Sequence, residues 1–231
     1  MGRMISIDTL AGDGSFSAYA AEPAGTPRAA IIVIQEIFGV NEGIRRKCDH
    51  WASLGYLAIA PDLFWRLEKG IELDPDVPDQ FQRALGLFGQ FDQNAGVADI
   101  EATIRAARAM GAAKTGCVGY CLGGRLAFMA AARTDIDASV GYYGVGIDNL
   151  LDERHAIANP LMLHIPTADH FVGPEVQQAM HDALDDHPRV VLHDYVGLDH
   201  GFAAEMGQRR NDEAARLADS RTEAFFAEHL G

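Results

Sequence analysis

Gly116-Cys117-Val118-Gly119-Tyr120-Cys121-Leu122-Gly123-Gly124-Arg125 is the stretch that decides the fold. Its first half predicts a short strand, and the apolar spacing of residues 122–132 predicts a helix. Between them lies Gly119-x-Cys121-x-Gly123, the pattern of a nucleophile elbow with cysteine in place of serine. Side chains two residues from the nucleophile would strike the neighbouring backbone, and glycine tolerates the angles of so tight a turn. The pattern therefore predicts a sharp turn that presents the sulfur of Cys121.

The predicted position of Cys121 favours acyl transfer. Backbone N–H groups and the dipole at a helix N-terminus stabilise a thiolate and the negative charge that forms on an attacked carbonyl. The alternative is a structural cysteine, because the short motif also occurs by chance and buried cysteines behave as small hydrophobic residues. The motif alone leaves both interpretations open.

Composition limits the classes of partner. The chain has 231 residues, 48% of them hydrophobic, which suits one α/β domain over residues 1–231. The net charge of −14 argues against nucleic acid and anionic membrane surfaces, since both attract basic patches. An anionic substrate would need a local arginine or lysine.

The three cysteines, Cys48, Cys117 and Cys121, fit no zinc-binding spacing. The N-terminal residues show no secretory pattern, and the apolar runs are far shorter than the roughly 20 residues that span a bilayer. We therefore expect a cytoplasmic protein with free thiols, with no metal and no membrane contact.

Strands and helices are predicted to alternate along the chain. The predicted strands are 4–9, 16–21, 29–35, 56–60, 114–120, 138–142, 160–165 and 189–195, and the predicted helices are 41–54, 79–91, 94–110, 122–132, 174–185 and 209–229. This order predicts an α/β fold, a mostly parallel central sheet with helices on both faces. Residues 63–78 show no clear periodicity, and connections of that length are often lids or binding loops. The chain has no glycine-rich dinucleotide fingerprint or P-loop.

A nucleophile, an acid and a histidine occur in the chain order that nucleophile-elbow enzymes use. They are Cys121, Asp169 and His200, and each follows a predicted strand. His200 lies in a glycine-flanked loop after the last strand, where a general base would be free to turn toward the nucleophile. The predicted oxyanion donors are the N–H of Leu122, directly after the nucleophile, and the N–H of Ile37.

Other residues compete for these roles. His164 and His193 lie inside predicted strands, and His170 adjoins the proposed acid. Asp199 is a rival acid, although it is the neighbour of the proposed base. Glu36 directly follows a buried strand, where ligands bind in parallel sheets. From the residues alone, a solvated loop glutamate is the slightly preferred interpretation of Glu36.

The sequence resembles the dienelactone hydrolase, or carboxymethylenebutenolidase, family of α/β-hydrolases. The matching segments span the chain and are 35–41 (QEIFGVN), 61–63 (PDL), 118–124 (VGYCLGG), 140–146 (VGYYGVG), 169–172 (DHFV) and 200–203 (HGFA). The resemblance implies an α/β-hydrolase fold, a Cys-His-Asp triad, no cofactor, and hydrolysis of an enol-lactone to a ring-opened acid. It also implies that Glu36 keeps the resting thiol neutral and then helps to generate the thiolate, which limits oxidation.

Two departures from the family bear on the substrate. Well-studied bacterial members hold the dienelactone carboxylate with arginines, but the corresponding positions here are Phe81 and Ala204. The candidate replacements are Arg66, Arg83 and Arg125, the last expected to lie away from the pocket.

Arg83 is the preferred candidate of these, and Phe38 and Trp65 are expected to line the site. The expected substrate is a small ester or lactone. The alternatives are a carboxylesterase or thioesterase acting on a less anionic substrate and, in another class, a non-catalytic binding protein. We expect a monomer.

Overall fold

The computed structural model describes residues 2–231. Eight strands form one sheet in the order β1-β2-β4-β3-β5-β6-β7-β8. The strands are β1 (Arg3–Asp8), β2 (Ser15–Ala21), β3 (Ala30–Ile34), β4 (Leu57–Pro61), β5 (Thr115–Tyr120), β6 (Ala138–Tyr142), β7 (Leu161–Pro166) and β8 (Val190–Tyr195). β2 pairs antiparallel with β1 and β4, and all the later pairings are parallel. This arrangement confirms the predicted mostly parallel sheet.

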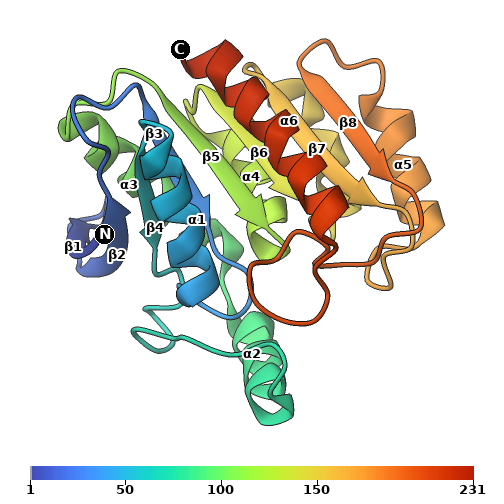
Figure 1. Cartoon of the computed structure of the whole chain (residues 1–231), viewed down its shortest axis with the longest axis horizontal. Helices are drawn as coiled ribbons and strands as arrows, with labels where there is room; N and C mark the ends of the chain where they lie inside the picture. The colour runs from blue at the N-terminus through green and yellow to red at the C-terminus, as the bar shows by residue number, and fades with distance from the viewer. Residues whose placement is uncertain (1) are drawn as a thin grey trace.

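Helices cover both faces of the sheet (Figure 1). α1 (Glu42–Ser53) and α6 (Asp212–Leu230) lie on one face, while α3 (Gln93–Ala109), α4 (Leu122–Arg133) and α5 (Pro174–Leu184) lie on the other. The central strand β3 shows why both faces must be covered: Ile31 and Val33 belong to the core beneath α1 and α6, whereas Ile32 and Ile34 belong to the opposite core. Side chains alternate between the faces of a strand, so a strand buried on both sides is apolar throughout.

α2 (Pro78–Gln90) lies beyond the edge of the sheet at which the parallel strands end (Figure 1). Pro78 occupies its first turn, where the missing N–H costs no helical hydrogen bond. The preceding loop contains no helix, as predicted, and a bridge between Gly39 and Glu72 ties it to the segment after β3. The loop and α2 therefore stand beside the ends of the central strands.

One element was not predicted, and the start of another was predicted wrongly. Residues Ile147–Ala156 form short 3₁₀ turns (η1) where no element was expected. α6 starts at Asp212 and not at residue 209, because the side chain of Asn211 accepts a hydrogen bond from the N–H of Ala214 and so caps the helix. Arg209 consequently lies in the loop before α6, and the direction of its side chain is not set by the helix.

Within residues 2–231, no helix is both long enough and apolar enough to cross a membrane.

Candidate active site

The turn from β5 into α4 places Cys121 at the start of the helix with φ 55° and ψ −114°. This backbone conformation is strained for a residue with a side chain and typically occurs at functional sites. Glycines make the turn possible. A Cβ on Gly119 would lie 1.9 Å from the carbonyl oxygen of Gly123, and a Cβ on Gly123 would lie 2.4 Å from that of Ile34. The half-buried thiol of Cys121 thus stands at the end of the central strands.

Two backbone N–H groups near Cys121 have no acceptor in residues 2–231: those of Ile37, after β3, and Leu122, in the first turn of α4. The first N–H groups of a helix lack intrahelical acceptors. Ile37, Leu122 and Cys121 line one cavity. An oxygen anion at Cys121 could accept hydrogen bonds from both groups.

His200 follows β8, and its ring is held by the carboxylate of Asp169, which follows β7. The distance from His200 Nδ1 to Asp169 Oδ2 is 2.9 Å, and both side chains are buried. The other oxygen of Asp169 accepts the N–H of Phe171 at 2.8 Å. His200 Nε2 is buried without a hydrogen-bond partner in the described chain, and the residue lines the same cavity as Cys121.

The electrostatics of His200 depend on the charge of Cys121. Burial lowers the pKa of His200, but the negative charge of a Cys121 thiolate and the hydrogen bond to Asp169 outweigh burial and raise this pKa to about 10. A negative charge on the sulfur of Cys121 would therefore favour the imidazolium form of His200. Loss of the thiolate charge would return His200 toward its neutral, basic form.

The rival groups have other partners. Asp199 accepts hydrogen bonds from His170 Nδ1 at 2.7 Å and from the backbone N–H of His200. These bonds outweigh the partial desolvation of this exposed carboxyl and lower its pKa to about 2. His164 is buried between Tyr195 and Thr222. Asp169, His170 and Asp199 have side chains close enough to share a metal ion, but the hydrogen bonds among them and to His200 already account for their arrangement.

Cys48 and Cys117 lie inside the protein and away from this cavity. Burial raises the pKa of both thiols, that of Cys117 to about 12. Neither thiol is therefore poised to react, which leaves Cys121 as the accessible thiol among the three cysteines.

Glu36 faces the same cavity as Cys121 and His200. Its carboxyl makes no hydrogen bond or ion pair with any other residue between 2 and 231. Burial raises the pKa of this carboxyl, and the nearby positive charges of His200, Lys47 and Arg209 partly oppose that rise. A carboxyl of raised pKa beside a thiol can exchange a proton with it.

The rest of the cavity, whose volume is about 70 Å³, is mostly apolar. The lining is completed by Phe38, Phe81, Leu85, Phe88, Val145, Phe171 and Arg209. Three of these side chains, Phe81, Leu85 and Phe88, come from α2. An apolar wall opposite the reactive groups suits a small organic substrate.

Comparison with known proteins identifies the family of this chain. The model of the dienelactone hydrolase family matches residues 16–230. The chain is 45% identical over 231 residues to a "Putative carboxymethylenebutenolidase" of Azospirillum brasilense, covering 99% of this chain and 100% of that one. It is 39% identical over 225 residues to a carboxymethylenebutenolidase of Pseudomonas putida, covering 96% and 95%.

This chain belongs to the dienelactone hydrolase family. It is accordingly a hydrolase of ester or lactone bonds with an α/β-hydrolase fold. A crystal structure titled "Putative Dienelactone Hydrolase" from Klebsiella pneumoniae superposes with a TM-score of 0.82 at 28% identity, covering 97% of this chain and 99% of that one.

Two residues expected to bind the substrate in this dienelactone hydrolase lie elsewhere. Arg83 is exposed on α2 and forms an ion pair with Glu68 at 2.5 Å. Trp65 stacks on Phe16 and donates a hydrogen bond to Asp99 at 2.9 Å. Neither lines the cavity. Of the three expected substrate-binding residues, only Phe38 lines it.

The other candidate arginines are also absent from the lining. Arg66 forms an ion pair with Asp99. Arg125, on α4, packs against Gly146. The arginine that does line the cavity is Arg209, which lies over the ring of Phe81 with its guanidinium carbon 5.6 Å from the ring centre. Sequence reasoning missed it because the helix was predicted to begin at this residue. The capping residue Asn211 was the signal that could have placed Arg209 in the loop.

Proposed function

We propose that this protein is a cysteine hydrolase that opens an enol-lactone such as dienelactone to a ring-opened acid. The observation that carries the proposal is the cavity shared by Cys121, at a strained strand-to-helix turn, and His200, hydrogen-bonded to the buried Asp169. Nucleophilic catalysis requires this combination of an accessible nucleophile, a base and a group that orients the base.

The first step forms an acyl-enzyme. The thiol of Cys121 transfers its proton to Glu36, and the sulfur attacks the lactone carbonyl. The carbonyl electrons move to oxygen, where the N–H groups of Ile37 and Leu122 stabilise the negative charge. The carbonyl re-forms, the ring C–O bond breaks, and the enolate oxygen leaves and is protonated from water or within the substrate.

The second step releases the acid. Acylation removes the thiolate charge, which is the main cause that raises the pKa of His200, so this histidine becomes neutral and basic at the point where a base is needed. It takes a proton from water as the water attacks the thioester, while Asp169 holds Nδ1–H and stabilises the imidazolium. The C–S bond then breaks, and the leaving sulfur of Cys121 takes back the proton held by Glu36. His200 releases its proton to solvent, which restores the resting enzyme.

The cavity suggests what the substrate looks like. An apolar body would contact Phe38, Phe81 and Phe171, while a carboxylate would pair with Arg209. Arg209 makes no ion pair or hydrogen bond with an acidic side chain in the described chain, although the protein carries a net charge of −14. Its guanidinium is therefore available for a substrate anion. A monomer in the cytoplasm remains part of this proposal.

Replacing Arg209 by methionine tests the substrate's charge. We expect the KM for an anionic lactone to rise about 10- to 100-fold with little change in kcat, because a charge-assisted hydrogen bond contributes about 1.5–3 kcal/mol. Hydrolysis of the neutral ester p-nitrophenyl acetate should change little. Arg83→Met is the matched control, since Arg83 is exposed and outside the cavity. An equal loss on both substrates would show that Arg209 does not select the anion.

The proposed function is tested by hydrolysis of cis- and trans-dienelactone and p-nitrophenyl acetate with the native protein and Cys121→Ser. We expect turnover of the lactones that falls steeply in the serine variant, and mass spectrometry of quenched reactions should show acyl groups on Cys121. Full activity of the variant would reject the cysteine mechanism. Cysteine-dependent turnover of the neutral ester or of a thioester, with little lactone activity, would instead favour a carboxylesterase or thioesterase, which the apolar lining also suits.

A further inference from the structure

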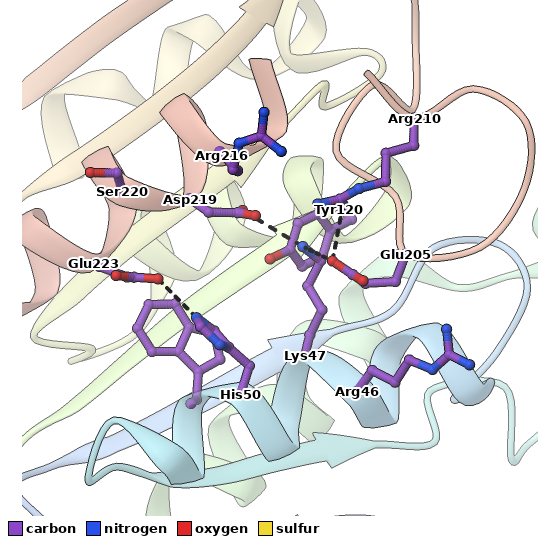
Figure 2. A pocket seen from close by; sticks show the side chains of 11 residues that line it. Arg46, Lys47, His50, Tyr120, Glu205, Arg210, Arg216, Asp219, Ser220 and Glu223 are labelled. Carbon is purple, nitrogen blue, oxygen red and sulfur yellow. Dashed lines mark hydrogen bonds and ion pairs between the residues drawn. The ribbon is translucent and has the colours of Figure 1, made fainter. Parts of the chain in front are cut away.

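A charged groove lies between α1 and α6 (Figure 2). Its volume is about 450 Å³. Arg46, Lys47 and His50 reach into it from α1, and Asp219 and Glu223 reach into it from α6. Tyr120, the last residue of β5, forms its floor. The groove therefore reaches Tyr120, the residue next to Cys121.

Lys47 differs from the other cations of this groove because it is buried. Its side chain is only 8% exposed, whereas that of Arg46 is 57% exposed. The ammonium lies 3.3 Å from Glu205 and 3.6 Å from Asp219, and 4.8 Å from the centre of the Tyr120 ring. It donates no well-formed hydrogen bond to a residue between 2 and 231. A buried ammonium has three donors to satisfy.

A second, smaller cavity joins Lys47 to the active site. Glu36, Lys47, Tyr120 and Glu205 line it, together with the N-terminal residues of α1. Its volume of about 10 Å³ matches the smallest space that can hold one water molecule. Glu36 lines both this cavity and the substrate cavity, while Lys47, Tyr120 and Glu205 also line the groove. Glu36 thus separates the reacting sulfur from the buried ammonium.

Several charged or titratable groups surround Glu36. They come from several elements. Tyr120 ends β5 and Cys121 follows it, Tyr143 follows β6, and His200 follows β8. The loop before α6 supplies Glu205 and Arg209, and α1 supplies Lys47. Burial raises the pKa of Glu36, and Lys47 is one of three positive charges that lower it. Among these, His200 changes charge during the proposed reaction and Arg209 would pair with a substrate anion. Lys47 neither changes charge in the proposed reaction nor pairs with the substrate.

We propose that Lys47 is a positioning residue for Glu36, facing its carboxyl across a cavity that holds one water and keeping it ionised in the resting enzyme. The inference rests on the proposed function for its catalytic meaning, because Glu36 must be ionised to take the proton of Cys121. The bridging water accepts a hydrogen bond from the ammonium and donates one to the carboxylate. It thereby gives the Glu36 carboxyl a hydrogen-bond partner and gives Lys47 an acceptor in addition to the carboxylates of Glu205 and Asp219. Glu205 and Asp219 hold Lys47 in this position and limit its effect.

The test is a direct titration of Glu36 by NMR in protein labelled with ¹³C at glutamate side-chain carboxyls, with Glu36→Gln identifying the resonance. Lys47→Met should raise the titration midpoint by about one pH unit or more, since a nearby opposite charge shifts a pKa by that order. Arg46→Met is the matched control, because Arg46 is the adjacent residue, lines the same groove and is paired with Glu42 on the surface. It should leave the midpoint unchanged.

A second variant covers the case in which Lys47→Met fails to fold. Lys47→Gln removes the charge but keeps a polar side chain that can still donate a hydrogen bond to Glu205, and it should raise the midpoint in the same direction as Lys47→Met. An unchanged midpoint in the folded variants would overturn the proposal.

Activity separates this inference from the proposed function. The acidic limb of the pH profile of kcat/KM should move upward with the midpoint in Lys47→Met. If the midpoint moves while the acidic limb does not, Lys47 controls the charge of Glu36 as proposed, but Glu36 takes no proton in the reaction.

Discussion

His200→Ala is expected to lower kcat/KM for lactones and esters by about 10⁴-fold, the loss typical of removing one member of a catalytic triad. The variant keeps Cys121 and the N–H groups of Ile37 and Leu122, so slow acylation can persist while release of the acyl group stops. We therefore expect p-nitrophenyl acetate to give at most one equivalent of p-nitrophenol per chain, followed by a stall. Rapid-quench mass spectrometry should then find the acyl group on Cys121.

His170→Ala provides the control for this experiment. His170 lies close to His200 in space, but its ring pairs with Asp199 at the surface and not with Asp169. We expect less than a few-fold change in kcat/KM, in line with the small contribution of an exposed ion pair. Steady turnover by His200→Ala at a rate near that of the native protein would mean that another group activates water.

Gly119→Ala is expected to prevent stable folding. The new methyl group would lie 1.9 Å from the carbonyl oxygen and 2.2 Å from the carbonyl carbon of Gly123, and neither backbone atom can move without separating α4 from the sheet. The free energy of unfolding should fall by more than roughly 4 kcal/mol, beyond the range of most single substitutions. Insoluble expression, or a large drop in the midpoint of urea unfolding, would be the readout.

Gly89→Ala in α2 is the matched control. A Cβ at that position meets no atom within 4 Å, and the residue is an exposed helical glycine. Alanine should stabilise the protein by up to about 1 kcal/mol because it favours helix and restricts the unfolded chain. If Gly119→Ala were as stable as Gly89→Ala, the turn would not need the close approach described here.

The sequence predicts structure well where the structure depends on neighbouring residues or on a periodic apolar pattern. The continuous apolar run of β3 and the glycines around Cys121 each have one structural explanation, and both the strand and the turn are found where expected. The chain order of Cys121, Asp169 and His200 also led to residues that the fold brings to one edge of the sheet. That edge exists because parallel strands all end on the same side.

The walls of the cavity could not be predicted in the same way. Whether an arginine faces the cavity depends on how its segment is placed in three dimensions. Arg83 lies on α2 and Arg209 in the loop before α6, and only Arg209 lines the cavity. Arg83 finds Glu68 on the surface, whereas three residues between the actual and the expected start of α6 leave Arg209 in a loop that turns inward. Trp65 was expected in the site from its loop, but Asp99 on α3 binds its ring nitrogen. These partners come from distant parts of the chain, so no local sequence pattern predicts the contacts.

The position of α2 has a consequence for how such an enzyme can diversify. The reacting groups sit on turns anchored by the central strands, whereas half of the aromatic wall belongs to a peripheral helix beyond the sheet (Figure 1). Substitutions at Phe81, Leu85 or Phe88 change the shape offered to a substrate without touching the elbow or the Asp169–His200 pair. Natural variation and laboratory selection can therefore change the substrate through residues of α2, while the reacting groups on the central strands stay the same.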